Sequence, residues 1–248
     1  MKVHSFAHKI ILLPIYYILH RNLVFGFIHK FFFDTFKYKK YKFNLNVVNL
    51  PLSHRASFLF KTYEYNDRKI CEDNLSSKNK CVIIGGGLGF IPTISYHKTN
   101  NKVLIIEINK KIIKNLKKNL NQNKCKYEIY NNNLTFSNKK SSIFYSSENF
   151  LETSSYLKTN KKILVRNINF KKVKKLLTYN TLIIDGEGVE DYYLQNLSKL
   201  KNIKYIIFEL HNNLLSKDKI KRIFHNLSKN KFKLADKCFN SYYFKKIN

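Results

Sequence analysis

The fold of this chain is decided by residues 81–120, which read CVIIGGGLGFIPTISYHKTNNKVLIIEINKKIIKNLKKNL. An apolar run at 81–84 leads into the glycine-rich segment 85–89, and a second apolar run, 103–106, ends at Glu107. Short Val/Ile runs without polar alternation are typical of strands that are buried on both faces of a parallel sheet. The residues between the two runs are numerous enough for a crossover helix, so we expect a strand–loop–helix–strand unit.

Apolar runs continue to alternate with helical patterns up to the C-terminus. Further strands are expected at 126–130, 181–185 and 204–210, with helices such as 110–120 and 192–200 between them. Two short aromatic-rich runs, 232–235 and 241–245, predict a terminal antiparallel hairpin. The expected fold is therefore α/β, a doubly wound and mostly parallel sheet with a C-terminal antiparallel hairpin.

The glycine-rich segment predicts a ligand site. Glycines at a strand end let a ligand approach the backbone closely, and the first N–H groups of the following helix can bind it. Gly85, Gly87 and Gly89 form the G-x-G-x-G pattern of S-adenosylmethionine-binding folds, and Gly86 lies within it. A dinucleotide fold would need a third glycine where Phe90 stands, and no P-loop lysine follows. A tight turn without a ligand is the alternative.

Glu107 comes about 20 residues after the glycines, at the end of the second strand. A carboxylate at this point can accept hydrogen bonds from both hydroxyls of a ribose. We therefore predict that Glu107 binds the ribose of the methyl donor. An exposed carboxylate at a strand end, without a ligand, is the alternative.

Two further segments carry a family resemblance: TLIIDGEGVEDY at 181–192 and KYIIFELH at 204–211. Together with the glycine loop they resemble the FkbM-type S-adenosylmethionine-dependent methyltransferases. The similarity runs from about Leu50 to the C-terminus and includes Tyr63-Glu64. The resemblance implies a Rossmann-like class I methyltransferase fold, a bound S-adenosylmethionine, and O-methylation of a hydroxyl on a saccharide, a lipid-linked glycan or a related metabolite.

The resemblance also implies site residues. Glu64 and, after the third strand, Asn133 are expected on the methyl donor. Asp185 and Glu187 lie at the carboxyl end of the fourth strand, where such sheets bind ligands. Because an alcohol of high pKa needs a base, we predict Asp185 or Glu187 in that role, with His211 as an alternate base or orienting group. The two carboxylates could hold a divalent cation, but no third ligand is evident, so no metal site is predicted and metal dependence stays an open alternative.

Two departures from the family pattern leave a second function open. Ile83 stands where these methyltransferases usually carry an acidic residue, and Ile183 replaces a lysine of the fourth strand. A non-catalytic, membrane-associated protein on the same scaffold is therefore an alternative.

The charge balance is strongly basic, since 46 Lys and Arg against 16 Asp and Glu give a net charge of +30. Such a charge suits nucleic acid or an anionic membrane. Few of the cations are arginine, which is the residue best suited to bidentate phosphate contacts, and an A/T-rich coding sequence also produces an excess of lysine. An RNA methyltransferase is an alternative, disfavoured because the sequence has no N/D-P-P-Y-like or Pro-Cys motif.

The chain divides by composition into an apolar and basic appendage (1–42), a strand–helix lead-in (43–80) and a catalytic domain (81–248). The appendage lacks a small-residue cleavage site, and its aromatic runs and lysines fit a helix pair at an anionic membrane surface. A helical cap on the main domain is the alternative. Four scattered cysteines fit reduced thiols, so we expect a cytoplasmic protein, peripheral on the inner face of the membrane.

Overall fold

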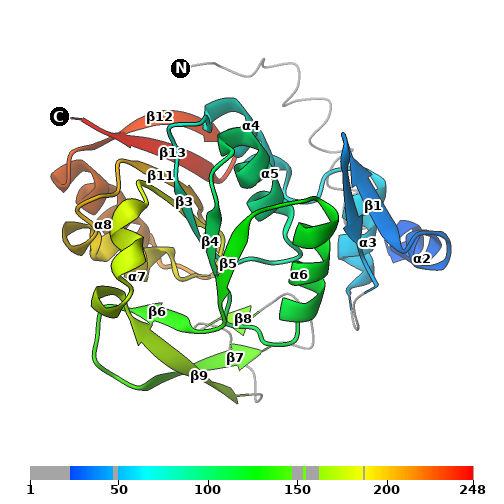
Figure 1. Cartoon of the computed structure of the whole chain (residues 1–248), viewed down its shortest axis with the longest axis horizontal. Helices are drawn as coiled ribbons and strands as arrows, with labels where there is room; N and C mark the ends of the chain where they lie inside the picture. Colours follow the sequence, from blue (N-terminus) through cyan, green and yellow to red (C-terminus); the bar gives the residue numbers. More distant parts are fainter. Residues whose placement is uncertain (1–22, 47–49, 147–152, 155–161, 187, 248) are drawn as a thin grey trace.

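A seven-stranded sheet forms the centre of the protein, and its strand order is β12-β13-β11-β10-β3-β4-β5 (Figure 1). The computed structural model describes residues 23–46, 50–146, 153–154, 162–186 and 188–247. Five strands are mutually parallel: β3 (Cys81–Ile84), β4 (Val103–Ile106), β5 (Tyr127–Tyr130), β10 (Thr181–Ile184) and β11 (Tyr205–Glu209). At one edge, β13 (Ser241–Lys246) runs antiparallel to both β11 and β12 (Phe232–Cys238).

This strand order confirms the predicted fold class. From the central β3 the chain moves outward to β4 and β5, and then returns to β10 on the other side of β3. The reversal places a switch point at the carboxyl ends of β3 and β10, where open α/β sheets bind ligands. With β13 inserted antiparallel beside β11, the sheet has the Rossmann-like class I methyltransferase fold with a C-terminal hairpin. Every predicted strand of the sheet is present, and β12 is longer than expected.

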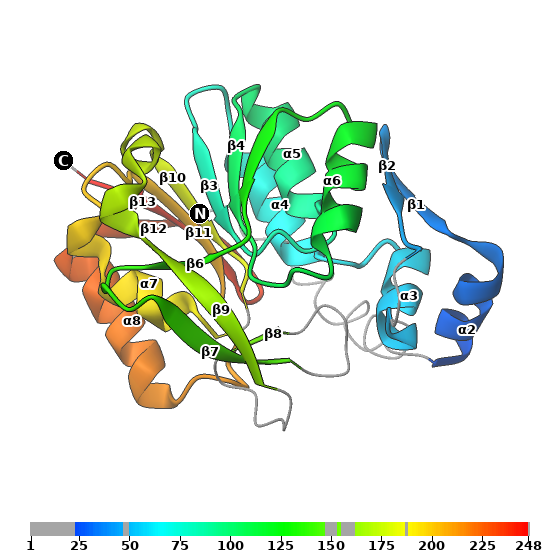
Figure 2. The ribbon, with the colours of Figure 1, turned by 60° about the horizontal axis from the view of Figure 1, so that its bottom comes forward.

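Helices cover both faces of the sheet, as Figure 2 shows. One face carries α4 (Tyr65–Asn74), α5 (Phe90–Thr99) and α6 (Ile113–Gln122), and the other carries α7 (Glu190–Gln195) and α8 (Lys217–Lys229). Alternate strand residues divide between two apolar cores: Ile83 packs in the first and Ile84 in the second. Burial on both faces explains why these strands read as continuous apolar runs.

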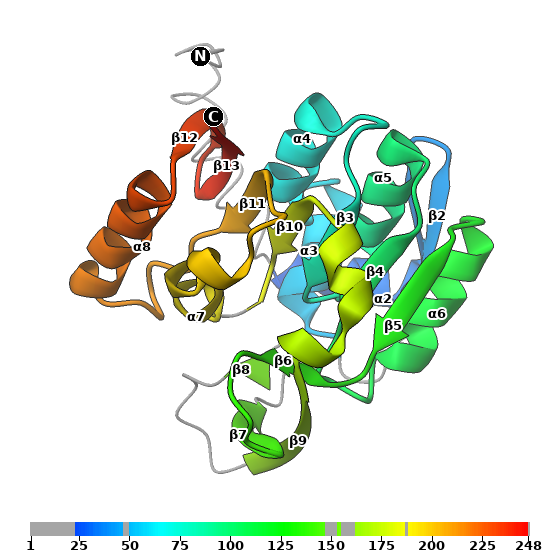
Figure 3. The same cartoon turned by 60° about the vertical axis from the view of Figure 1, so that its left-hand side comes forward.

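A second, four-stranded sheet lies beyond the carboxyl end of β5 (Figure 3). It has the order β6-β9-β7-β8, formed by β6 (Asn133–Thr135), β9 (Lys162–Asn169), β7 (Ser141–Ser146) and β8 (Thr153–Ser154). The hydroxyl of Tyr193, on α7, donates a 2.9 Å hydrogen bond to the Leu134 carbonyl and fixes this sheet to the main domain. Two 3-10 turns, η1 (Phe170–Lys172) and η2 (Lys174–Thr178), lead from β9 back to β10, and η3 (Leu197–Lys199) follows α7.

A small N-terminal unit packs against α6 (Figure 2). It comprises α2 (Leu23–Phe32), the hairpin β1 (Thr35–Tyr38) and β2 (Tyr41–Asn44), and α3 (Leu52–Leu59). Two asparagines at α6 bind the outer edge of β2: Asn119, on the helix, accepts from the Asn44 N–H at 2.7 Å, and Asn123, the residue after its last, accepts from the Lys42 N–H at 3.0 Å. Residues 1–22 of the predicted appendage lie outside the described residues.

The helix α2 buries its smallest residue and exposes its largest ones. A side chain at Gly26 would lie 2.0 Å from the Leu52 carbonyl oxygen, so glycine permits the close contact between α2 and α3. Phe27, Phe31 and Phe32 are 54%, 67% and 75% exposed. No helix within the described ranges is long and apolar enough to cross a membrane. All four cysteines are buried thiols.

Candidate functional site

The glycine loop after β3 adopts a backbone that only glycine adopts easily. Gly85, Gly87 and Gly89 have φ angles of 90°, 49° and 87°. A Cβ at Gly85 would lie 2.0 Å from the Asp185 carbonyl oxygen, so the loop and the end of β10 touch backbone to backbone. A Cβ at Gly86 would lie 2.8 Å from the Ile105 and Leu116 side chains. The loop therefore needs its glycines at both of these positions.

Glu107 turns its carboxylate toward the glycine loop. Its Oε2 accepts hydrogen bonds from the Gly86 N–H at 2.8 Å and the Gly87 N–H at 3.2 Å, and its Oε1 accepts from the Asn109 N–H at 2.7 Å. Burial raises the pKa of Glu107, and the backbone hydrogen bonds oppose that shift. The residue is only 5% exposed, which excludes the exposed strand-end carboxylate considered from sequence.

Glu64 approaches the same loop from the first residue before α4. It has a positive φ of 47°, and its Oε1 lies 3.6 Å from where a Cβ of Gly87 would be. Its Oε2 is buried and finds no hydrogen-bond partner among the described residues. Burial raises the pKa of Glu64 to about 7, with a further contribution from the Glu209 carboxylate. A buried carboxylate with one oxygen free of hydrogen bonds is suited to bind a cation or to accept from a hydroxyl donor.

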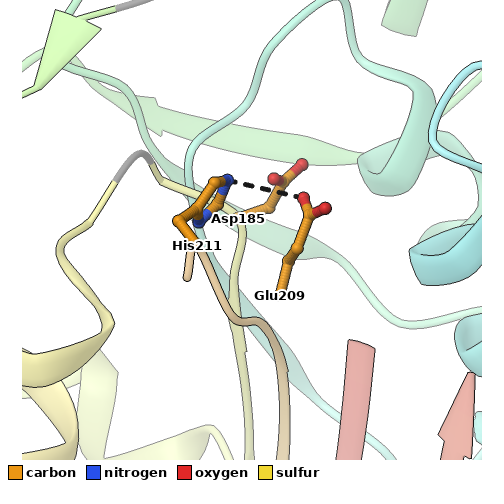
Figure 4. A group of neighbouring side chains, drawn as sticks. All are labelled: Asp185, Glu209 and His211. Carbon is orange, nitrogen blue, oxygen red and sulfur yellow. Dashed lines mark ion pairs between the residues drawn. The ribbon is translucent and has the colours of Figure 1, made fainter. Parts of the chain in front are cut away.

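Three side chains converge at the carboxyl ends of β10 and β11 (Figure 4). A nitrogen of His211 and one carboxylate oxygen each from Asp185 and Glu209 all lie within 4.8 Å of one another. The amide of Asn240 donates a 2.6 Å hydrogen bond to Glu209 Oε1, while Glu209 Oε2 lies 3.6 Å from His211 Nε2. Glu187, the second predicted base, lies outside the described residues.

Glu190 orients the histidine. His211 Nδ1 and Glu190 Oε1 form a short hydrogen bond, and the same oxygen accepts from the His211 backbone N–H at 3.1 Å. Glu190 is fully buried in the first turn of α7. Its contact with His211 depends on the packing of α7 beside the end of β11.

The predicted Asn133 is engaged in the second sheet. Its amide donates to Asn167 Oδ1 at 2.9 Å, within the pairing of β6 with β9. The neighbouring Asn131 instead donates a 2.7 Å hydrogen bond to the Glu107 carbonyl oxygen, and so contacts the residue beside the glycine loop.

The site groups carboxyl side chains in a protein whose net charge is +30. Carboxylates from four elements lie at the carboxyl ends of the central strands or beside them: Glu64, Asp67, Asp185, Glu190 and Glu209. Burial raises the pKa of Asp67 well above its usual range, and the carboxylates of Glu209 and Glu64 raise it further. Grouped carboxylates of this kind favour a cationic ligand.

No family model matches this chain, and no curated protein does. Its similarities to solved structures are distant. A methyltransferase from Pyrococcus furiosus is 12% identical, with 93% of this chain and 98% of that one covered and a TM-score of 0.46. M. jannaschii TYW2 in complex with AdoMet is 14% identical, with 86% of each chain covered and a TM-score of 0.46. A ribosomal protein L11 methylase from Lactobacillus delbrueckii subsp. bulgaricus is 10% identical, with 78% of this chain and 80% of that one covered and a TM-score of 0.45.

These TM-scores are below 0.5, so the assignment of the fold rests on the chain itself. Its strand order, the glycine loop after β3 and the antiparallel β13 together define a class I methyltransferase fold.

Proposed function

We propose that this protein is an S-adenosylmethionine-dependent methyltransferase that methylates a hydroxyl of a saccharide, a lipid-linked glycan or a related metabolite. The supporting observation is that the glycine loop, Glu107 and Glu64 meet after β3 and β4, while Asp185 and His211 meet at the ends of the adjoining strands β10 and β11. The resemblance of residues 181–192 and 204–211 to FkbM-type methyltransferases supports the choice of a hydroxyl acceptor.

The residues around the glycine loop fit the methyl donor. The carboxylate of Glu107 uses three of about four acceptor positions on backbone N–H groups, which leaves capacity for a ribose hydroxyl. The buried Oε2 of Glu64 would gain a partner from the positively charged part of S-adenosylmethionine. When bound, the donor supplies an activated methyl group on a sulfonium.

The residues at the ends of β10 and β11 fit the acceptor. A hydroxyl placed beside Asp185 or His211 can give up its proton there, and Glu190 holds the imidazole in one orientation. Methyl transfer needs the two reactants aligned, an effect that can contribute about 7–11 kcal/mol in well-oriented systems. The second sheet follows β5 directly and is suited to form a wall of the acceptor site.

Calorimetry with S-adenosylmethionine and S-adenosylhomocysteine tests the donor, and labelled methyl transfer to purified glycan, lipid and RNA fractions tests the acceptor. We expect binding of both compounds and labelling of the glycan or lipid-linked fraction. Glu64→Gln should weaken binding of S-adenosylmethionine. The matched control is Glu128→Gln, which removes a carboxylate on β5 that pairs with Lys102 at 2.9 Å and should leave donor binding unchanged. Absence of donor binding would favour a non-catalytic scaffold, and labelling of RNA alone would refute the hydroxyl-saccharide acceptor.

We also propose that the N-terminal unit holds the protein on an anionic membrane surface. The outward face of α2 is apolar and aromatic, and the same N-terminal unit carries exposed lysines: Lys30, Lys37 and Lys40. Rings that enter the headgroup boundary and lysines that meet anionic lipid are the two contributions that bind peripheral helices. An acceptor embedded in that membrane would then lie near the site.

Vesicle flotation of the full chain tests this attachment. We expect the protein to float with phosphatidylserine-containing vesicles at low salt, and less with pure phosphatidylcholine. The pair Phe27→Ser and Phe31→Ser should abolish flotation, whereas Phe239→Ser, at a phenylalanine that is 49% exposed on the β12–β13 turn, should not. Equal flotation of all variants would contradict the attachment through α2.

A further inference from the structure

Asp185, Glu209 and His211 have the composition and spacing of a metal-ligand set. Ligand bonds of about 2.1 Å place neighbouring ligand atoms about 3 Å apart and opposite ones about 4.2 Å apart. The three candidate atoms lie within 4.8 Å of one another, and the His211 Nε2 to Glu209 Oε2 distance is 3.6 Å. The 3.6 Å distance exceeds the spacing of neighbouring ligand atoms, and the 4.8 Å limit that of opposite ones, by about 0.6 Å, so side-chain movements of about that size would bring all three onto one ion.

The orientation of His211 supports the same conclusion. Metal-binding histidines usually donate their second ring nitrogen to a carboxylate, which fixes the tautomer and the direction of the ligating nitrogen. Here Nδ1 contacts the fully buried Glu190, and Nε2 is directed toward Glu209. Figure 4 shows the imidazole facing the two carboxylates, which come from neighbouring parallel strands.

The partners of the carboxylates also prepare the site for a cation. Asn240 donates to Glu209 Oε1 and itself accepts from the Asn66 amide at 2.8 Å, which directs Glu209 Oε2 toward His211. Glu190 Oε2 is buried without a hydrogen-bond partner in the described part of the chain. One histidine therefore faces several carboxylates, and their charges need compensation from a ligand.

We infer that Asp185, Glu209 and His211 bind one divalent cation of the type that accepts both carboxylate oxygen and imidazole nitrogen, such as Mn²⁺. This site adjoins the glycine loop, because the Asp185 backbone lies against Gly85, but its three ligand side chains are not the ones proposed to bind the methyl donor. A cation here would leave coordination positions open for water or for a hydroxyl oxygen of the acceptor. It would lower the pKa of that hydroxyl; His211, with Nδ1 on Glu190 and Nε2 on the ion, would then hold the ion in place of acting as the base.

Titration of the full-length protein with Mn²⁺, followed by EPR, tests this site. We expect about one ion per chain to lose its free-ion signal, and pulsed EPR to show coupling to an imidazole nitrogen. His211→Ala and Asp185→Asn should weaken binding by at least about 10-fold, and Glu190→Gln, which leaves the ligands in place, by about 10- to 100-fold. The matched control is Asp73→Asn, because Asp73 lies on α4 in a 2.6 Å exposed ion pair with Lys69.

Two results would overturn the inference: absence of Mn²⁺ binding by the wild type, or unchanged binding in both His211→Ala and Asp185→Asn. The wild-type nitrogen coupling does not depend on any variant folding. Calorimetry with S-adenosylmethionine on the same samples keeps this inference distinct from the proposed function. Donor binding without Mn²⁺ binding refutes the metal site alone, and Mn²⁺ binding without donor binding refutes the methyltransferase alone.

Discussion

Replacement of Glu107 by glutamine tests the centre of the proposed donor site. The carboxylate accepts hydrogen bonds from three backbone N–H groups, at 2.7, 2.8 and 3.2 Å. An amide keeps only one acceptor oxygen, so the NH₂ group must face N–H donors on one side. The less costly rotamer keeps the two glycine contacts and leaves the Asn109 N–H without its acceptor, which costs about 1–3 kcal/mol. Because burial already disfavours the charged form of Glu107, we expect the lower half of that range.

Urea and thermal denaturation measure the loss of stability, and binding calorimetry measures the loss of affinity for S-adenosylmethionine. A loss of 1–2 kcal/mol lowers the thermal midpoint of a chain of this size by about 2–8 °C. Loss of the charged acceptor for one ribose hydroxyl, at about 1.5–3 kcal/mol, weakens donor binding by about 10-fold or more. The control Glu128→Gln lies on the adjacent strand β5 and pairs with Lys102, so it should change stability by less than about 0.5 kcal/mol.

Each part of this reasoning has its own refutation. Stability equal to wild type would show that the Glu107 carboxylate does not hold the glycine loop. Reduced stability with unchanged affinity for S-adenosylmethionine would remove Glu107 from the ribose contact and leave it a purely structural role.

Three further changes test the packing and the charge of the site. Asn119→Ala should destabilise the protein by about 2–4 kcal/mol in urea denaturation, because it removes hydrogen bonds to the edge of β2. Asn121→Ala, on the same helix, should have little effect, and equal losses of stability in the two variants would contradict this account. Gly85→Ala should cost about 2–6 kcal/mol from backbone strain and the clash with β10, and soluble protein of wild-type stability would refute the 2.0 Å contact. The pKa of Glu64 is raised from 4.5 to about 7, so between pH 4.5 and pH 7 the folded protein binds more protons than the unfolded chain. The free energy of unfolding therefore falls as the pH rises through this window. Binding of a cationic donor should therefore release protons near pH 6 and none at pH 8.5, as measured by calorimetry in buffers of different ionisation enthalpy; proton uptake would contradict the sign.

The sequence by itself determined the sheet and the glycine loop. Strands buried on both faces leave continuous apolar runs, and a loop that needs positive φ angles leaves glycines, so both signals are local. The meeting of Glu107 with the glycine loop followed from the same signals, because adjacent parallel strands end at the same edge of a sheet. In contrast, strands β7 and β9 carry only three-residue apolar runs among polar residues, and the second sheet was not among the predicted strands.

Only the tertiary structure decided which polar side chains meet. Glu209 matched a family motif, but its approach to Asp185 depends on the register of β10 with β11, and its direction depends on Asn240 in a distant turn. The contact of Glu190 with His211 joins residues that are 21 positions apart and lie on different elements. The asparagines that hold β2 are 75 and 81 positions from their partners. Such contacts leave no periodic pattern in the chain, because hydrogen bonds between single side chains depend on packing geometry and not on the local spacing of apolar residues.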